Sequence, residues 1–142
     1  MLNSIIHNTN SFIASVPKLK RKKYGQFFTN KTTANFMASL FCFDLSKPEL
    51  HLLDAGAGTG VLSAAVIDKL IRDGYKGRIY LTCYETDELV LPILKSNLDL
   101  AKEKYGINYE IIHDSYLTSQ PFEDNLLFSD SSMIILSVIL LI

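Results

Sequence analysis

The sequence is short of the residues that mark several protein classes. Its 142 residues include no tryptophan, two cysteines and four prolines, and no two prolines are adjacent. Cys42 and Cys83 are too few for a disulfide framework, and no Cys and His residues stand at metal-ligand spacing. Both cysteines have apolar neighbours. We therefore expect no metal site, and two small core thiols in a reducing cytoplasm.

Apolar runs long enough for a membrane are also missing. The run MIILSVILLI, residues 133–142, is ten residues long, whereas a membrane-spanning helix needs about 20. Residues 1–18 have neither a basic start nor a continuous apolar stretch, so they do not indicate a secretory signal. We expect a cytoplasmic protein without a membrane partner.

Acidic residues are absent from residues 1–43. This segment carries six basic residues, namely Lys18, Lys20, Arg21, Lys22, Lys23 and Lys31. The rest of the chain has eight basic residues against fifteen acidic ones, and the net charge is −1. Such asymmetry can mark an arm that faces nucleic acid, but charge alone favours a solvated terminal segment, because short basic runs have many uses.

What the sequence does contain is an alternation of short strand patterns and longer helical patterns. Residues 50–53, 78–84 and 108–112 predict strands, and the apolar tail is a fourth candidate. Helical spacing follows Asn30, continues over 61–71, and returns from a cap at Asp87 to about Lys104. Pro92 lies within this last pattern and also allows a later start or a kink there. Residues 1–16 predict only weak organisation. The alternation favours βαβ units, hence an α/β fold with a parallel sheet.

Residues just after each strand deserve most weight, because parallel sheets bind ligands beyond the carboxyl ends of their strands. The first strand ends in Asp54-Ala55-Gly56-Ala57-Gly58-Thr59-Gly60. A dinucleotide fingerprint would need a third glycine where Val61 stands, so that match fails. Asp54 before the glycines suits a ligand with an ammonium group. A glycine turn that only packs helix on strand is the alternative.

The other two strand ends offer complementary chemistry. Glu85, after the second strand, can accept both hydroxyls of a ribose or cap a helix. Asp114 or Ser115, after the third, can accept from an adenine amino group, and Tyr116 can pack on the ring. Asp and Ser are also common turn residues. Taken together, an ammonium partner, a ribose partner and a base partner describe S-adenosylmethionine (SAM).

Four stretches carry a resemblance to a known family. They are KKYGQFFTN with the following ANFMASLF, LLDAGAGTG, CYETD with a downstream NL, and IIHDSYL. In this order they resemble the cofactor motifs of gamma-type DNA adenine-N6 methyltransferases of restriction–modification systems, over residues 18–118. The resemblance implies a Rossmann-like class I SAM-dependent methyltransferase fold, SAM as cofactor and DNA as partner. GQFFT matters most, because a methyltransferase acting on RNA, protein or a small molecule would not need it.

The resemblance also assigns roles to single residues. It implies that the methionine end of the cofactor is held by Gln26, Phe28 and Thr29, and its amino-acid portion by Asp54, Ala55 and Gly56, with Gly58 in the same loop. It implies that the ribose is held by Glu85, and the adenine by Thr86, Asp114, Ser115 and Tyr116.

Two positions depart from the family pattern. Asn30 stands where the family usually has proline. The third site reads Asp-Ser-Tyr-Leu rather than Asp-Phe-Leu, which leaves open whether Asp114 or Ser115 meets the adenine.

The family's catalytic loop, Asn-Pro-Pro-Tyr/Phe after the fourth strand, does not occur in this sequence. We therefore assign no catalytic residue. Residues 1–17 are expected to be an N-terminal extension, and residues 18–142 the SAM-binding part of a catalytic domain, with the first half of its sheet, truncated before that loop and inactive alone. A truncated gene, a split subunit and an expression fragment all fit.

Two other readings remain open. The chain could be a non-catalytic interaction module, or a methyltransferase acting on another substrate. An unpaired apolar strand at the tail would also favour self-association.

Overall fold

The chain folds around one parallel β-sheet with helices between its strands. The structure is a computed structural model that describes residues 1–23, 28–119 and 133–137. Its elements are α1 (Leu2–Ser15), α2 (Lys18–Lys23), α3 (Lys31–Ser39), β1 (Glu49–Asp54), α4 (Val61–Arg72), β2 (Arg78–Tyr84), α5 (Leu91–Tyr105), β3 (Asn108–Ile112), α6 (Tyr116–Ser119) and β4 (Met133–Ser137). The strands are all parallel, in the order β3-β2-β1-β4. This confirms the predicted α/β fold.

The sheet places the ends of its strands at one edge. Glu49 pairs with Arg78 and Asp54 with Cys83, so β1 and β2 end together. β3 pairs with β2 up to Tyr84↔Ile112. β4 lies on the other side of β1, with a shift of register between Leu53 and Asp54. The fourth strand expected in the tail is thus confirmed over 133–137, while residues 138–142 lie outside the described residues.

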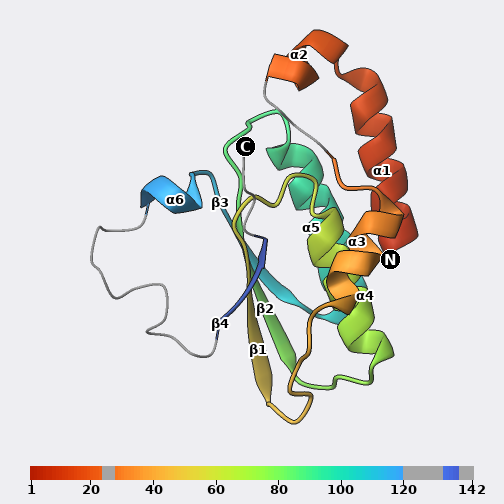
Figure 1. The fold of residues 1–142 in the computed structure, drawn as a ribbon, viewed down its shortest axis with the longest axis vertical. Helices are drawn as coiled ribbons and strands as arrows, with labels where there is room; N and C mark the ends of the chain where they lie inside the picture. Colours follow the sequence, from red (N-terminus) through yellow and green to blue (C-terminus); the bar gives the residue numbers. More distant parts are fainter. Residues whose placement is uncertain (24–27, 120–132, 138–142) are drawn as a thin grey trace.

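Helices α1, α3, α4 and α5 gather beside one face of this sheet (Figure 1). α4 lies at the centre of that layer, and its first seven residues, from Val61 to Ile67, are all buried. Alternate strand residues such as Leu50, Leu52, Ile79 and Leu81 join the same core. Each buried aliphatic side chain contributes about 1.5–3 kcal/mol, so this layer fixes where α4, and the loop before it, must lie.

The first helix contradicts the weak organisation expected of residues 1–16. α1 runs for 14 residues, and Leu2, Ile5 and Thr9, at helical spacing, are buried against α4 and α5. Asn, Ser and Thr lower the helix propensity of this segment, but packing of one face outweighs propensity. The domain boundary expected at residue 17 remains a prediction.

Helix α5 begins later than a cap at Asp87 would require. Its N-cap is Val90, and Pro92 lies in its first turn, where a missing N–H costs nothing. Asp87 instead accepts a hydrogen bond from the backbone N–H of Leu89 at 2.8 Å. The expected cap at Asp87 is therefore wrong, because these residues form a separate turn before the helix, and the later start that Pro92 allowed is confirmed.

The two cysteines differ. Cys83 on β2 is fully buried, as expected, whereas Cys42 is exposed in the segment between α3 and β1. The expectation of a second core thiol is wrong, since the helix before it ends at Ser39. Within the residues that the structure describes, no helix has the length and apolarity needed to cross a bilayer.

Candidate functional site

Hydrogen bonds join the three predicted strand ends to one another. The Ala57 N–H donates to the carbonyl of Tyr84 at 2.9 Å, which ties the glycine loop to the end of β2. The Glu85 N–H donates to the carbonyl of Ile112 at 3.1 Å, which ties the end of β2 to the end of β3. The structure thus brings the three segments together at the carboxyl edge of the sheet.

The glycine loop needs glycine at two positions. Gly58 and Gly60 have φ of +53° and +80°, the left-handed region that residues with a Cβ rarely adopt. Gly60 is also the N-cap of α4, and a Cβ there would lie 3.1 Å from Leu94 Cδ1 of α5. The loop is therefore shaped both by its backbone conformation and by close packing of two helices.

Glu85 holds the loop through its carboxylate. Oε2 accepts the Gly58 N–H at 2.7 Å, and Oε1 accepts the N–H groups of Thr86 and Asp87, each at 2.8 Å. A carboxylate has about four acceptor positions, so three backbone donors leave room for a further donor. The side chain is partly exposed, which lets a ligand hydroxyl reach it.

Asp54 is only 1% exposed. Its Oδ2 accepts the hydroxyl of Ser63, on the first turn of α4, at 2.5 Å. Burial raises the pKa of the neighbouring Cys83 thiol, and the nearby Asp54 carboxylate raises it further. The structure gives Asp54 a role in fixing the strand to the helix, and its predicted place near a ligand ammonium remains a prediction. Ala55, Gly56 and Gly58 of the same loop are partly exposed.

The end of β3 presents an aromatic corner. The ring of Tyr116 meets that of Tyr84 edge-on, with centroids 5.2 Å apart. Asp114 is exposed, and its Oδ1 accepts the Ser115 N–H at 2.7 Å, while Ser115 is partly buried. His113 Nε2 lies 3.1 Å from the carbonyl of Thr86, whose side chain is exposed beside this corner.

Phe28, in the FFT stretch, lies against α1. Phe28 and Phe12 meet edge-on with centroids 6.0 Å apart, and Thr29 is partly buried. The Asn30 side chain accepts the Thr33 N–H at 2.9 Å and so caps α3. This explains the asparagine in place of the family's proline, since asparagine is among the best N-caps. Gln26 lies outside the described residues.

Sequence reasoning missed a buried polar network behind the glycine loop. Thr9 of α1 donates to the hydroxyl of Thr59 at 2.9 Å. Asn97 of α5 donates to the Thr59 carbonyl at 2.9 Å and accepts from the Asn8 amide at 3.0 Å. The one signal was Asn97, a polar residue on an apolar helix face and part of the NL motif. Nothing in the sequence singled out Thr9 or Asn8.

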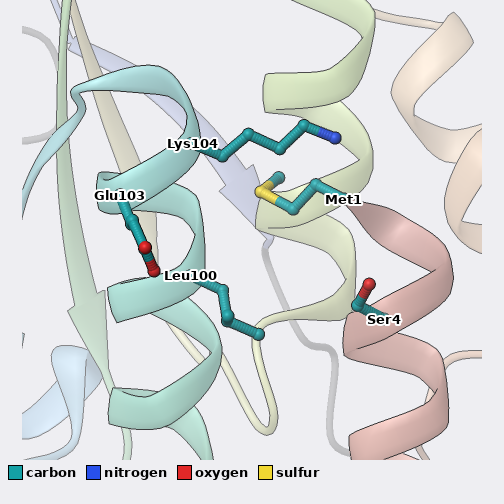
Figure 2. A pocket seen from close by; sticks show the side chains of 5 residues that line it. All are labelled: Met1, Ser4, Leu100, Glu103 and Lys104. Atoms are coloured by element: carbon teal, nitrogen blue, oxygen red, sulfur yellow. The ribbon is translucent and has the colours of Figure 1, made fainter.

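A shallow cavity of about 330 Å³ lies elsewhere, between α1 and α5. Figure 2 shows its lining side chains, which are Met1, Ser4, Leu100, Glu103 and Lys104. None comes from a strand end, so this cavity is separate from the cluster described above. Over residues 1–23, 28–119 and 133–137, no three His, Cys, Asp or Glu residues are grouped as metal ligands would be.

Comparison with known proteins finds similarity to methyltransferases, as the motifs predict. No family model matches the chain. It is 40% identical over 102 residues to the type II methyltransferase M.BsuBI of Bacillus subtilis, covering 71% of this chain and 20% of that protein. It is 36% identical over 102 residues to the type II methyltransferase M.PstI of Providencia stuartii, covering 72% of this chain and 19% of that protein. The chain thus spans about a fifth of the length of these relatives.

Among solved structures, a class I S-adenosylmethionine-dependent methyltransferase of Listeria monocytogenes overlaps with a TM-score of 0.47. Its sequence is 17% identical, and the overlap covers 73% of this chain and 32% of that one. The similarity to the two type II methyltransferases confirms the resemblance to methyltransferases of restriction–modification systems, and adenine N6 as the acceptor remains a prediction.

Proposed function

We propose that this relative of type II methyltransferases binds S-adenosylmethionine at the carboxyl edge of its sheet. One observation carries the proposal. The glycine loop, Glu85 and the end of β3 are bonded into one cluster by Ala57–Tyr84, Gly58–Glu85 and Glu85–Ile112 hydrogen bonds. A turn that only packed helix on strand would not need an acidic side chain to join the glycine loop to the end of β2.

The chemistry of the cluster fits the parts of the ligand. The partly exposed backbone of Ala55, Gly56 and Gly58 can approach the amino-acid portion closely, with Asp54 favouring its ammonium group. Glu85 retains an acceptor position for a ribose hydroxyl. The residues proposed to meet the adenine are Thr86, Asp114, Ser115 and Tyr116, and those proposed for the methionine end are Gln26, Phe28 and Thr29.

When bound, SAM supplies a methyl group on a positively charged sulfur. The residues of this chain hold and orient that cofactor, and orientation supplies much of the rate in a direct transfer. We propose adenine N6 in DNA as the acceptor; the support is the order of the GQFFT, DAGAG and YETD motifs and the similarity to type II methyltransferases.

An adenine must leave the DNA stack to be methylated. The Asn-Pro-Pro-Tyr/Phe tetrad that would hold it is absent from these 142 residues, so we expect SAM binding but no methyl transfer from this chain alone. A cytoplasmic location and self-association through the C-terminal strand are parts of the same proposal.

The test is calorimetric titration of the folded chain with SAM, with NAD as the control ligand. Asp54→Asn keeps the size and an acceptor for Ser63 but removes the charge, and Asp99→Asn makes the same change at an exposed site on α5. We expect saturable SAM binding that weakens in Asp54→Asn and is unchanged in Asp99→Asn. No binding by a chain shown to be folded would contradict the proposal and favour a non-catalytic interaction module.

A further inference from the structure

Helix α1 touches two separate segments of the proposed cofactor site. Thr9 contacts the glycine loop through the hydroxyl of Thr59, at 2.9 Å between the two oxygens. Phe12, one turn further along the same helix, contacts the ring of Phe28 at 6.0 Å between centroids. Phe28 and Thr59 are about 30 residues apart in the sequence, yet one helix meets both.

The contact at the loop is buried and specific. Thr9 and Thr59 are 2% and 3% exposed, and their hydroxyls pair with each other away from water. Asn97, fully buried, holds the carbonyl of Thr59 from the opposite helix. A buried hydrogen bond whose partner is removed leaves a polar group unsatisfied, so this network holds Thr59 in one position.

Thr59 stands between the two glycines whose conformations shape the loop. Gly58, before it, donates to Glu85, and Gly60, after it, donates to the carbonyl of Ala57 at 2.8 Å. Fixing Thr59 from behind therefore limits the movement of both donors. The side of the loop that faces α1 and α5 is held, while Gly56 and Gly58 stay partly exposed.

We infer that α1 is a positioning element of the cofactor site, with Thr9 setting the glycine loop and Phe12 setting Phe28 relative to it. Neither Thr9 nor Phe12 touches the cofactor. Thr9 acts through Thr59, which adjoins Gly58, and Phe12 acts through Phe28, which is proposed to contact the cofactor. The inference rests on the proposed function for the identity of the ligand, but the ordering of the loop is measurable without it. Thr9 and Phe12, which lie within residues 1–17, are then part of the binding machinery rather than of an extension to it.

The test compares Thr9→Val, which keeps the shape but removes the hydroxyl, with Thr9→Ser, which keeps the hydroxyl. Ile5→Val is the matched control, because Ile5 is fully buried on the same helix but belongs to the apolar core. For each variant of the 142-residue chain, the dissociation constant for SAM, the melting temperature and the hydrogen exchange of the Ala57 and Gly60 amides are measured.

We expect Thr9→Val to raise the SAM dissociation constant and to speed exchange of the loop amides, each by about tenfold, the effect of losing one ordinary hydrogen bond. Thr9→Ser should stay within about threefold of the original chain on both readouts. Ile5→Val should lower the melting temperature and leave the dissociation constant within about twofold.

The outcomes separate the two claims. If Thr9→Val behaves as Ile5→Val does, losing stability without loosening the loop or weakening SAM, α1 is only structural and the inference is wrong. If the original chain binds no SAM but Thr9→Val still loosens the loop, the proposed function fails while the positioning role stands.

Discussion

At the scale of single residues, the account depends most on Glu85, because its carboxylate joins the glycine loop to the end of β2. Changing Glu85→Gln replaces one acceptor oxygen by an NH₂ group, which must face a backbone donor on one side or the other. A hydrogen bond to a charged group contributes about 1.5–3 kcal/mol. We predict that Glu85→Gln weakens SAM binding by about 10- to 100-fold, measured by calorimetry.

Glu88→Gln is the matched control for that change. Glu88 is exposed three residues further along. Unchanged SAM affinity in Glu85→Gln, or an equal loss in Glu88→Gln, would show that Glu85 does not contribute to the site.

Gly60 tests whether the loop's shape is required. Gly60 and Gly74 both have positive φ, but a Cβ at Gly60 would press on Leu94 whereas one at Gly74 meets nothing within 4 Å. We predict that Gly74→Ala lowers the free energy of unfolding by about 1 kcal/mol and Gly60→Ala by about 2–4 kcal/mol, since overpacking adds to the backbone cost. Denaturant unfolding of both variants measures the difference. Equal losses would mean that Leu94 yields without cost.

The two thiols give a prediction that depends on protonation. Burial, with a smaller contribution from Asp54, raises the pKa of the Cys83 thiol, and only the thiolate reacts with alkylating reagents. We predict that Cys42 is labelled in the folded chain while Cys83 is labelled only on unfolding, followed by mass spectrometry of digested peptides. Rapid labelling of Cys83 under native conditions would contradict the burial on which the β1–β2 core depends.

At the scale of elements, the sequence predicted the strands better than the first helix. Arg78–Tyr84 was expected as a strand and is one, because its β-formers alternate across the sheet in agreement with its burial. The fourth strand was recognised from apolarity alone. α1 was missed because Asn8, Thr9 and neighbouring polar residues make it look like a polar segment. Two of those polar residues are the ones that bond to α5 and the glycine loop.

Helix α1 gives a prediction at this scale. Ile5 is fully buried, whereas His7 is exposed on the same helix. We predict that Ile5→Ala lowers the free energy of unfolding by about 2–5 kcal/mol, the usual result of leaving a cavity in a core. His7→Ala should change it by less than about 0.5 kcal/mol. Comparable small effects at both positions would mean that α1 is not part of the core.

The candidate site was predictable in its parts but not in its connections. Glycines, acids and their order after each strand pointed to Asp54, Glu85 and the end of β3, since parallel sheets collect these residues at one edge. The sequence could not show that Glu85 bonds to Gly58, or that Asp54 bonds to Ser63, because both depend on how α4 packs on the sheet.

At the scale of the whole molecule, charge is unevenly distributed. Residues 18–23, five of which are basic, form α2, and the rest of the chain is acidic overall. If this segment contacts DNA phosphates, the logarithm of the binding constant should fall with the logarithm of salt concentration by about 0.9 for each phosphate neutralised. We predict that Lys18→Gln with Lys20→Gln reduces that slope, measured by fluorescence anisotropy of labelled duplex.

The control for that prediction is Lys95→Gln with Lys102→Gln, which removes two exposed charges from α5 instead. Equal effects of the two double variants would mean that binding follows net charge alone. Absence of DNA binding at low salt would contradict the predicted contact between this segment and DNA phosphates.

The central claim is that SAM binds where the glycine loop, Glu85 and the end of β3 meet, and the most direct measurement is a map of amide chemical shifts during titration with SAM. The account predicts that the largest shifts fall on Gly56, Gly58, Glu85 and Ser115, with smaller ones at Thr9, while Ser4 and Lys104 at the separate cavity do not move (Figure 2). Shifts confined to the cavity between α1 and α5, or no shifts at all in a folded chain, would contradict it.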